Sequence, residues 1–332
     1  MGELEWQCRL GADLMTTALV DPAPPSPPWR PWGRLRRWLA LAGFSGRWAV
    51  ILPPLLWLLV FFLVPLVVVI KIGFSASIVG QPPYLPLLTF SPQGDVQMTL
   101  HLSNFIFLAQ DHLYLDAYLS SLKIAAISTV LALFIGYPMA YFIARSPDRL
   151  RNILLMLVIL PFWSSFLLRV YAWIGLLKNN GVINNFLGLF HIGPFTLLYT
   201  DFAVYLGIVY TYLPFMILPL YTNLVKLDGA LLEASADLGA KPFRTFLSVT
   251  LPLSLPGIVA GSMLVFIPAI GEYVIPQLLG GPSTLMIGRV LWDEFFTNRD
   301  WPTASAVAIA MLVVVVVPLM ILQRAQNAVV ER

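Results

Sequence analysis

EASADLGAKPFRTFLSVTLPLSLPG, residues 233–257, is a polar, helix-forming insert between two long apolar segments. Asp228 precedes it and is of a residue type that caps helix N-termini, so residues 229–238 favour a short helix. Gly239 suits the left-handed conformation that ends a helix, and Pro242 suits the first position of the next one. The insert therefore predicts a short helix, a sharp turn and a second helix that returns to the membrane.

The composition places the chain in a lipid bilayer. Of its 332 residues 58% are hydrophobic and 11% are charged, whereas a soluble protein averages about 25% charged residues. A globule of this composition would expose large apolar patches to water, so we expect a multi-pass membrane protein. The net charge of +3 does not indicate nucleic-acid binding. The single cysteine, Cys8, excludes an intrachain disulfide, and no Cys/His cluster that could hold a metal is present.

Six segments are long and apolar enough to cross a bilayer, which takes about 20 residues. They are residues 48–70, 118–143, 152–177, 202–225, 257–280 and 303–323. We therefore expect an all-α, polytopic bundle of six transmembrane helices. Its predicted parts are a tail 1–47, a first transmembrane helix 48–71, an outer loop 72–116, a five-helix domain 117–323 and a tail 324–332. No cleavable signal peptide is expected, because the first apolar run is long enough to remain as an anchor.

The basic residues predict the orientation. One side of the predicted membrane holds 14 of the 20 lysines and arginines: Arg9, Arg30, Arg34, Arg36, Arg37, Arg47, Arg145, Arg149, Arg151, Lys226, Lys241, Arg244, Arg324 and Arg332. The long loop 72–117 on the other side has none, so both termini and the polar insert are expected in the cytoplasm. Residues 1–31 are Pro-rich and predicted to be disordered. Residues 32–44 fit either a helix on the membrane surface or a solvated charge run.

The polar insert resembles the EAA loop of permease subunits of ATP-binding-cassette (ABC) importers, whose pattern reads E-A-A, three residues, G, nine residues, I-x-L-P. The positions that match in type and spacing are Glu233, Ala234, Gly239, Leu251 and Pro252. Two positions differ from the pattern but keep a residue of similar size: Ser235 stands where the pattern has alanine, and Val249 where it has isoleucine. The resemblance implies a helix at about 229–240 that docks into a cytoplasmic ATPase through Glu233, Ala234, Ser235 and Gly239. From the residues alone, an ordinary interfacial helix stays the alternative.

From about residue 48 to its end, the chain is similar to permeases of bacterial polyamine importers of the putrescine/spermidine type, the putrescine version in particular. The stretches that carry this similarity are DAYLSSLKIAAISTV, PFWSSFLLRVYAWIGLLKNNGVINNFL, FIPAIGEYVIPQLLGG and IGRVLWDEFFTNRDWPTASAVAIAM. The similarity implies the type I ABC importer permease fold and a place in the bacterial inner membrane. It also implies three partners: a homodimeric ABC ATPase, a second homologous permease in a heterodimer, and a periplasmic polyamine-binding protein.

The chain has no phosphate-cradling G-x-x-x-x-G-K-[ST] loop, so we expect no ATP hydrolysis by this chain. The resemblance places ATP and magnesium on the partner ATPase. No catalytic residues are predicted, since the histidines His101, His112 and His191 all fall in outer loops and no two carboxylates share a span.

Glu272 is the strongest candidate for the substrate pathway. It lies within the apolar run VFIPAIGEYVIPQLL, with Tyr273 beside it, and Pro268 and Pro276 are expected to break the helix on either side. An ionised group at membrane depth costs several kcal/mol, so it faces a cavity or a partner. A carboxylate and aromatic faces suit a flexible polyamine cation, at about 0.5–2 kcal/mol for each cation–π contact. The alternative is a structural ion pair, for example with Arg169.

Further candidates for the pathway are the aromatic residues Trp163, Tyr171 and Trp173, which interfacial anchoring explains equally. The outer acids Asp111, Asp116, Asp293 and Glu294 could attract a cation or meet the delivery protein, and solvated loop acids are the alternative. Three other classes of protein are alternatives to a polyamine permease: a permease of this fold for iron, an anion or a sugar; a membrane-embedded enzyme; and an ion-driven transporter. A membrane-embedded enzyme fits poorly, because no catalytic constellation is found at membrane depth. An ion-driven transporter fits poorly, because six spans with one deep acid and a cytoplasmic docking helix are not typical of it.

Overall fold

The computed structural model describes residues 46–90, 96–282 and 284–330, as α-helices with one small β-hairpin. The chain divides into two compact units, Met1–Pro65 and Leu66–Arg332. The all-α prediction is confirmed apart from the antiparallel hairpin of β1 (Leu88–Phe90) and β2 (Val96–Met98), which lies in the predicted outer loop. The predicted tail 1–31 and surface helix 32–44 lie outside the described residues.

The first apolar segment is a continuous helix. It comprises α3 (Gly46–Leu58), the π-turn η1 (Leu59–Leu63) and α4 (Val64–Gly73), and Val50–Gly73 is long and apolar enough to span a membrane. In α3, Pro53 and Pro54 lie inside the helix. Each proline removes one backbone hydrogen bond, and the helix nevertheless continues.

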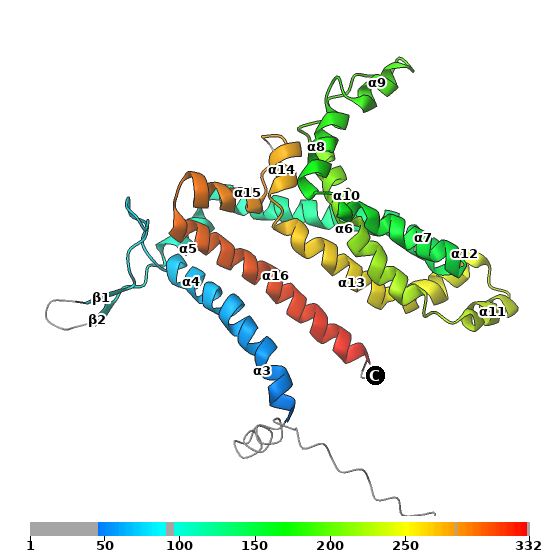
Figure 1. The fold of residues 1–332 in the computed structure, drawn as a ribbon, viewed down its shortest axis with the longest axis horizontal. Helices are drawn as coiled ribbons and strands as arrows, with labels where there is room; N and C mark the ends of the chain where they lie inside the picture. The colour runs from blue at the N-terminus through cyan, green and yellow to red at the C-terminus, as the bar shows by residue number, and fades with distance from the viewer. Residues whose placement is uncertain (1–45, 91–95, 283, 331–332) are drawn as a thin grey trace, which may run out of the picture. The chain divides into compact units, whose positions relative to one another are not determined.

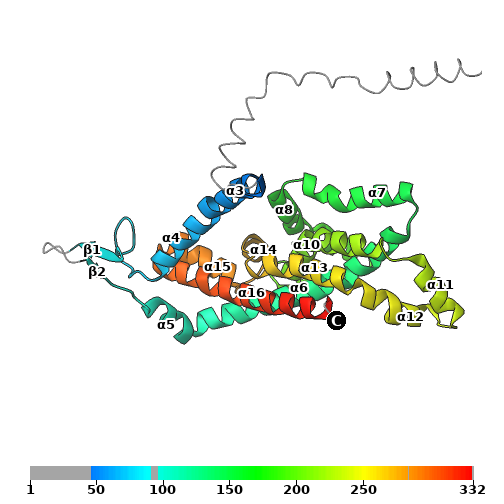
Figure 2. The ribbon, with the colours of Figure 1, turned by 90° about the horizontal axis from the view of Figure 1, so that it is seen from below.

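The second unit is built on three packed helices (Figures 1 and 2): α6 (His112–Arg145), α10 (Asp201–Leu224) and α13 (Leu251–Ile270). Around them lie α5 (Ser103–Gln110), α7 (Asp148–Ile159), α8 (Phe166–Leu177), α9 (Val182–Gly188), α14 (Val274–Leu279), α15 (Ile287–Trp292) and α16 (Trp301–Val330). Short helical turns join several of these: η2 (Leu160–Trp163), α12 (Pro242–Thr245), η3 (Phe246–Thr250) and η4 (Asp293–Thr297).

Small residues let the three central helices approach closely. A Cβ added at Gly136 of α6 would stand 3.0 Å from the Met216 side chain, and one at Gly261 of α13 would stand 2.9 Å from the same side chain. Met216 of α10 is fully buried between them. Helix association in lipid depends on such close packing, because burial from water supplies no drive there.

Polar side chains join the same helices to their neighbours. The Tyr137 hydroxyl of α6 shares a 2.9 Å hydrogen bond with the Ser254 hydroxyl of α13. The Tyr118 hydroxyl donates to the Val307 carbonyl of α16 at 2.7 Å. In hydrocarbon these bonds fix the helices relative to one another, at about 1 kcal/mol each.

Two predicted spans differ from the structure. The segment predicted at 152–177 is a pair of helical stretches, Asp148–Trp163 and Phe166–Gly188, bent by 90°. The break follows Pro161 and falls at Ser164 and Ser165, where the backbone is extended. The structure therefore has five helices that could span a membrane among the described residues, or six if the bent pair is one span.

The other difference concerns the span predicted at 257–280. Its helix begins earlier, at Pro242, and ends at Ile270. Gly271, Glu272 and Tyr273 form a turn before α14. Glu272 is therefore not in the middle of a continuous helix but at a helix break.

Candidate functional site

The predicted short helix is α11 (Gly229–Asp237), and its capping is as predicted. The Asp228 carboxylate accepts a 3.0 Å hydrogen bond from the Ala230 amide at the N-terminus. At the other end Gly239 has a φ of 78°, in the left-handed region that favours glycine. Pro242 lies at the start of α12, so both the helix and its sharp turn are confirmed.

The turn after α11 is held by two backbone bonds and a side-chain bond. The Gly239 amide donates to the Ala236 carbonyl at 2.8 Å, and the Ala240 amide donates to the Ser235 carbonyl at 3.1 Å. This pair of bonds is the Schellman arrangement, which satisfies carbonyls at a helix end. The Ser235 hydroxyl also shares a 2.9 Å hydrogen bond with the Thr245 hydroxyl. The serine that replaces the third alanine of the EAA pattern thus ties α11 to α12.

α11 and its turn present apolar side chains to the outside. Leu238 is 88% exposed and Phe243 is 73% exposed, and Leu231 is also exposed. Glu233 and Ala234, from the predicted docking set, are exposed beside them. A rigid, slim helix with exposed apolar residues at its end can insert into a groove of another protein.

α11 lies at one end of the second unit, while the β-hairpin and α15 lie toward the opposite end (Figures 1 and 2). The two ends are joined by the long helices α6, α10 and α13. The arrangement agrees with the prediction that the insert and the outer loop face opposite sides of the membrane.

Glu272 is buried, with 8% of its surface exposed, and both of its carboxylate oxygens are hydrogen-bonded. Oε1 accepts from the amides of Val274 and Ile275 at 3.1 and 3.3 Å, at the N-terminus of α14. Oε2 accepts from the hydroxyl of Tyr212 in α10. The carboxylate therefore caps α14 and joins it to α10, and negative charge is favourable at this helix end.

Close backbone packing supports the Glu272 turn from the side of α15. A Cβ added at Gly288 would stand 2.5 Å from the Gly271 carbonyl oxygen and 2.8 Å from that of Glu272. Only glycine allows α15 to approach the turn this closely.

Arg169 does not pair with Glu272 in the structure. Its guanidinium lies over the rings of Phe162 and Phe166, 5.4 and 5.9 Å from their centroids. The one ion pair within 4 Å among the described residues is Arg151 with Asp148. The ion pair suggested as the alternative for Glu272 is therefore not formed among the described residues, and the carboxylate is held instead by Tyr212 and the α14 amides.

Aromatic rings connect Glu272 and Arg169 indirectly. The ring of Tyr212 lies 6.2 Å from that of Phe215, which packs edge-on against Phe162 at 5.2 Å. Phe162 in turn lies beneath the Arg169 guanidinium. Glu272 and Arg169 are thus the two polar ends of one contact chain.

The other predicted pathway residues lie in different surroundings. Tyr273 stacks on Trp292 with centroids 4.5 Å apart. Trp163 and Tyr171 are 79% and 57% exposed, on η2 and α8. Trp173 packs edge-on against Tyr210 at 5.3 Å. Exposed aromatic residues at a membrane surface also fit anchoring, so the structure leaves their role as a prediction.

Two of the outer acids have structural partners. The Asp111 carboxylate caps α6 by accepting from the Leu113 amide at 2.9 Å. Glu294 accepts from the Tyr114 hydroxyl at 2.9 Å and from the Asn298 side chain at 3.0 Å. No group of three or more His, Cys, Asp or Glu side chains that could hold a metal occurs among the residues that the structure describes.

Sequence reasoning missed Tyr212 and Gly288. Tyr212 lies 60 residues before Glu272, and no local pattern joins the two. Gly288 is flanked by the apolar Ile287 and by Arg289, and its sequence context does not reveal the backbone that it meets. Both were found only through the tertiary contacts.

Comparison with known proteins gives a family match and similar permeases. Residues 132–332 match the family described as "Binding-protein-dependent transport system inner membrane component". The spermidine/putrescine transport system permease protein PotB of Salmonella typhimurium is 38% identical over 273 residues, which is 82% of this chain and 90% of that protein. Its Escherichia coli counterpart is also 38% identical over 273 residues and is covered to 94%.

A solved structure shows the same fold. The chain is similar to a bacterial ABC transporter involved in the import of the acidic polysaccharide alginate, with a TM-score of 0.66. The match covers 88% of this chain and 99% of the alginate transporter chain, at 17% identity. At this identity the likeness carries the fold alone.

Proposed function

The chain belongs to the inner membrane components of binding-protein-dependent transport systems, and on that premise we propose that it is the permease subunit of an ABC importer for polyamines. The observation that carries the substrate class is its 38% identity to spermidine/putrescine permeases over 82% of the chain. Putrescine is the proposed main substrate, with spermidine as a second.

The proposed coupling runs through α11. A partner ATPase would hold this helix in a cleft, in contact with Glu233, Ala234 and the exposed Leu238. The Schellman turn and the hydrogen bond between Ser235 and Thr245 support this role, because they make α11 and α12 one rigid piece. Movement of the ATPase would then pass through α12 directly into α13, and from there to the packed helices α6 and α10.

The proposed pathway includes Glu272. A buried carboxylate that is held by Tyr212 and by the α14 amides is pre-oriented for a cation. Because it lies at a helix break, a shift of α14 against α13 would change its surroundings. Such a bistable element is what alternating access requires.

The partners follow from the same proposal. ATP and magnesium would be bound by a homodimeric ATPase, a second homologous permease would complete the pathway, and a periplasmic binding protein would deliver the polyamine. The proposed location is the bacterial inner membrane, with both termini in the cytoplasm.

The test is the uptake of labelled putrescine and spermidine by cells that lack this chain, with and without its return. Restored putrescine uptake that exceeds spermidine uptake supports the proposal in full. If neither is restored while the protein is present in the membrane, the polyamine substrate is wrong. The ligand of the delivery protein would then identify another small solute.

A further inference from the structure

An unbroken series of aromatic ring contacts begins beside Glu272. Tyr273 stacks on Trp292, with centroids 4.5 Å apart and planes at 16°. Trp292 contacts Phe296 at 4.1 Å. The series therefore begins with the ring of Tyr273, which follows Glu272 directly in the chain.

The series continues toward the outer loop. Phe296 contacts Phe295 at 4.9 Å, and Phe295 stacks on Trp301 at 5.2 Å with planes at 4°. Trp301 then faces Tyr84 of the outer loop at 6.3 Å. We call the six rings of Tyr84, Trp301, Phe295, Phe296, Trp292 and Tyr273 the aromatic run.

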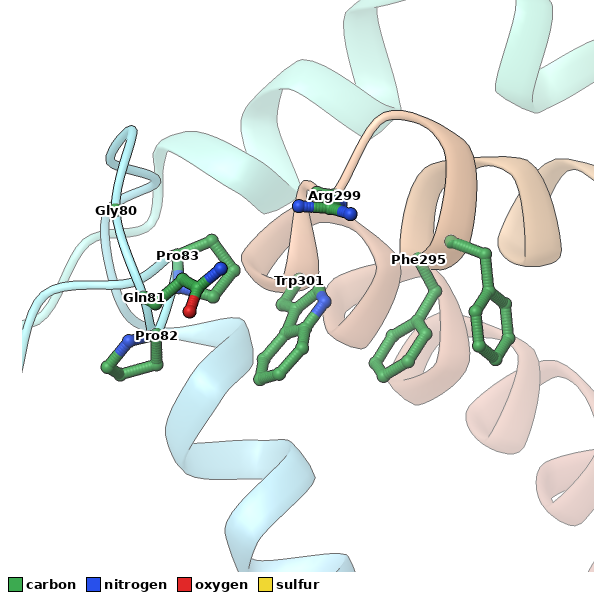
Figure 3. A pocket seen from close by; sticks show the side chains of 8 residues that line it. Gly80, Gln81, Pro82, Pro83, Phe295, Arg299 and Trp301 are labelled. Carbon is green, nitrogen blue, oxygen red and sulfur yellow. The ribbon is translucent and has the colours of Figure 1, made fainter.

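The outer end of the aromatic run opens into a cavity of about 570 Å³. Figure 3 shows the loop with Pro82 and Pro83 on one side and the rings of Trp301 and Phe295 on the other, with Arg299 above them. The cavity lies toward the end of the unit that carries the β-hairpin, opposite to α11.

Two rings of the aromatic run are exposed at the surface of the chain. Trp292 is 40% exposed and Phe296 is 55% exposed. The segment 292–301 that carries most of the run also holds three acids, Asp293, Glu294 and Asp300, against one base, Arg299. Exposed parts of aromatic rings in a segment with excess negative charge can attract organic cations.

We propose that the aromatic run is the route by which a polyamine passes from the outer cavity to Glu272. The inference rests on the proposed polyamine substrate. An ammonium group can lie over a ring face, and the methylene chain between two ammonium groups can lie against the neighbouring ring. Each such contact is weak, so the cation is guided without being trapped, and Glu272 receives it at the inner end.

Arg299 sets the outer limit of this route. It lines the cavity and has a left-handed backbone with a φ of 55°. Its positive charge opposes a cation in the cavity that it shares with Phe295, Phe296 and Trp301, so it lowers the attraction of the outer part of the route. Arg299→Gln is therefore expected to raise polyamine transport about twofold to threefold, because the repulsion from an exposed charge is screened but not abolished.

The decisive experiment uses the complete transporter, with its ATPase, second permease and delivery protein, in proteoliposomes. Trp292→Leu and Phe296→Leu remove a ring but keep apolar volume, and Trp292→Phe keeps a π face. We expect each leucine variant to lower the polyamine transported per ATP hydrolysed by about tenfold, equivalent to about 1.4 kcal/mol. ATPase activity stimulated by the delivery protein should stay, and Trp292→Phe should restore most of the transport.

The control is Phe134→Leu. Phe134 lies on α6, is 80% exposed and is not part of the aromatic run. Its replacement should therefore leave the polyamine transported per ATP hydrolysed unchanged. If Phe296→Leu and Trp292→Leu also leave the ratio unchanged, the route is wrong. If stimulated ATPase activity falls together with transport, or if Arg299→Gln lowers both, this surface serves the docking of the delivery protein instead. A wild-type transporter that imports no polyamine would overturn the proposed function itself, whatever the variants do.

Discussion

At the scale of single residues, Glu272 has one structural role and one proposed role, and a single substitution can separate them. Its carboxylate accepts bonds from two α14 amides and from Tyr212, and it carries the negative charge that the proposed substrate needs. Glu272→Gln keeps an oxygen for the amides and removes the charge. We expect uptake to fall about tenfold, because the substrate loses a hydrogen bond to a charged group, and such a bond contributes about 1.5–3 kcal/mol. Assembly should stay intact, because the amides keep their acceptor.

Uptake and the amount of assembled complex are to be measured side by side for this variant. Glu272→Ala is the companion variant, since it also leaves the α14 amides without their acceptor, at a cost of about 1–3 kcal/mol. Its assembly should therefore fall as well. Wild-type uptake by Glu272→Gln would show that the carboxylate is structural only.

Gly288 gives a second prediction at this scale. An alanine there would place its Cβ 2.5 Å from the Gly271 carbonyl oxygen, so the backbone would have to move. We expect Gly288→Ala to destabilise the protein by about 1–3 kcal/mol, the usual cost of overpacking, as measured by thermal unfolding in detergent. Gly175→Ala in α8 is the matched control, because a Cβ there meets nothing within 4 Å. Equal unfolding temperatures would contradict the close approach of α15 to the turn.

At the scale of elements, α11 is tested by the glycine that ends it. Gly229 begins α11 and Gly239 follows its end, and a Cβ at either meets nothing within 4 Å, but only Gly239 has a positive φ. Gly239→Val should therefore disturb the turn by about 1–2 kcal/mol or more, while Gly229→Val should not. We expect ATP hydrolysis to continue in Gly239→Val while uptake falls several-fold. Equal uptake by the Gly239→Val and Gly229→Val variants would contradict the coupling role of α11.

Local signals predicted α11 well because its ends depend on neighbours in the sequence: Asp228 caps it and Gly239 ends it. The break at Ser164–Ser165 was missed, because apolar length alone does not show where a helix bends inside a membrane. A break near Glu272 was expected at Pro268 and Pro276, and the structure places it between them, at Gly271–Tyr273. The partner of Glu272 was missed for a different reason. Tyr212 is brought to it by the packing of α10 on α13 and α14, which hydropathy does not encode.

At the scale of the whole molecule, the separation of α11 from the outer loop gives a direct test of orientation. Cys8 is the single cysteine in the sequence, so Cys8→Ser supplies a cysteine-free background in which single cysteines can be placed. Val79 in the outer loop is fully exposed and Ala236 is exposed on α11. The loop 72–117 lacks lysine and arginine, while Lys226, Lys241 and Arg244 flank α11, so the positive-inside rule predicts that α11 lies in the cytoplasm.

A membrane-impermeant maleimide should therefore label Val79→Cys in intact spheroplasts and label Ala236→Cys only after the membrane is opened. The Cys8→Ser parent should stay unlabelled in both states. The reverse pattern would place α11 outside the cell, where no cytoplasmic ATPase could reach it, and coupling through this helix would be impossible. The expected pattern would put the outer cavity and the aromatic run on the side from which a delivery protein arrives, with Glu272 between them and the helices that lead to α11.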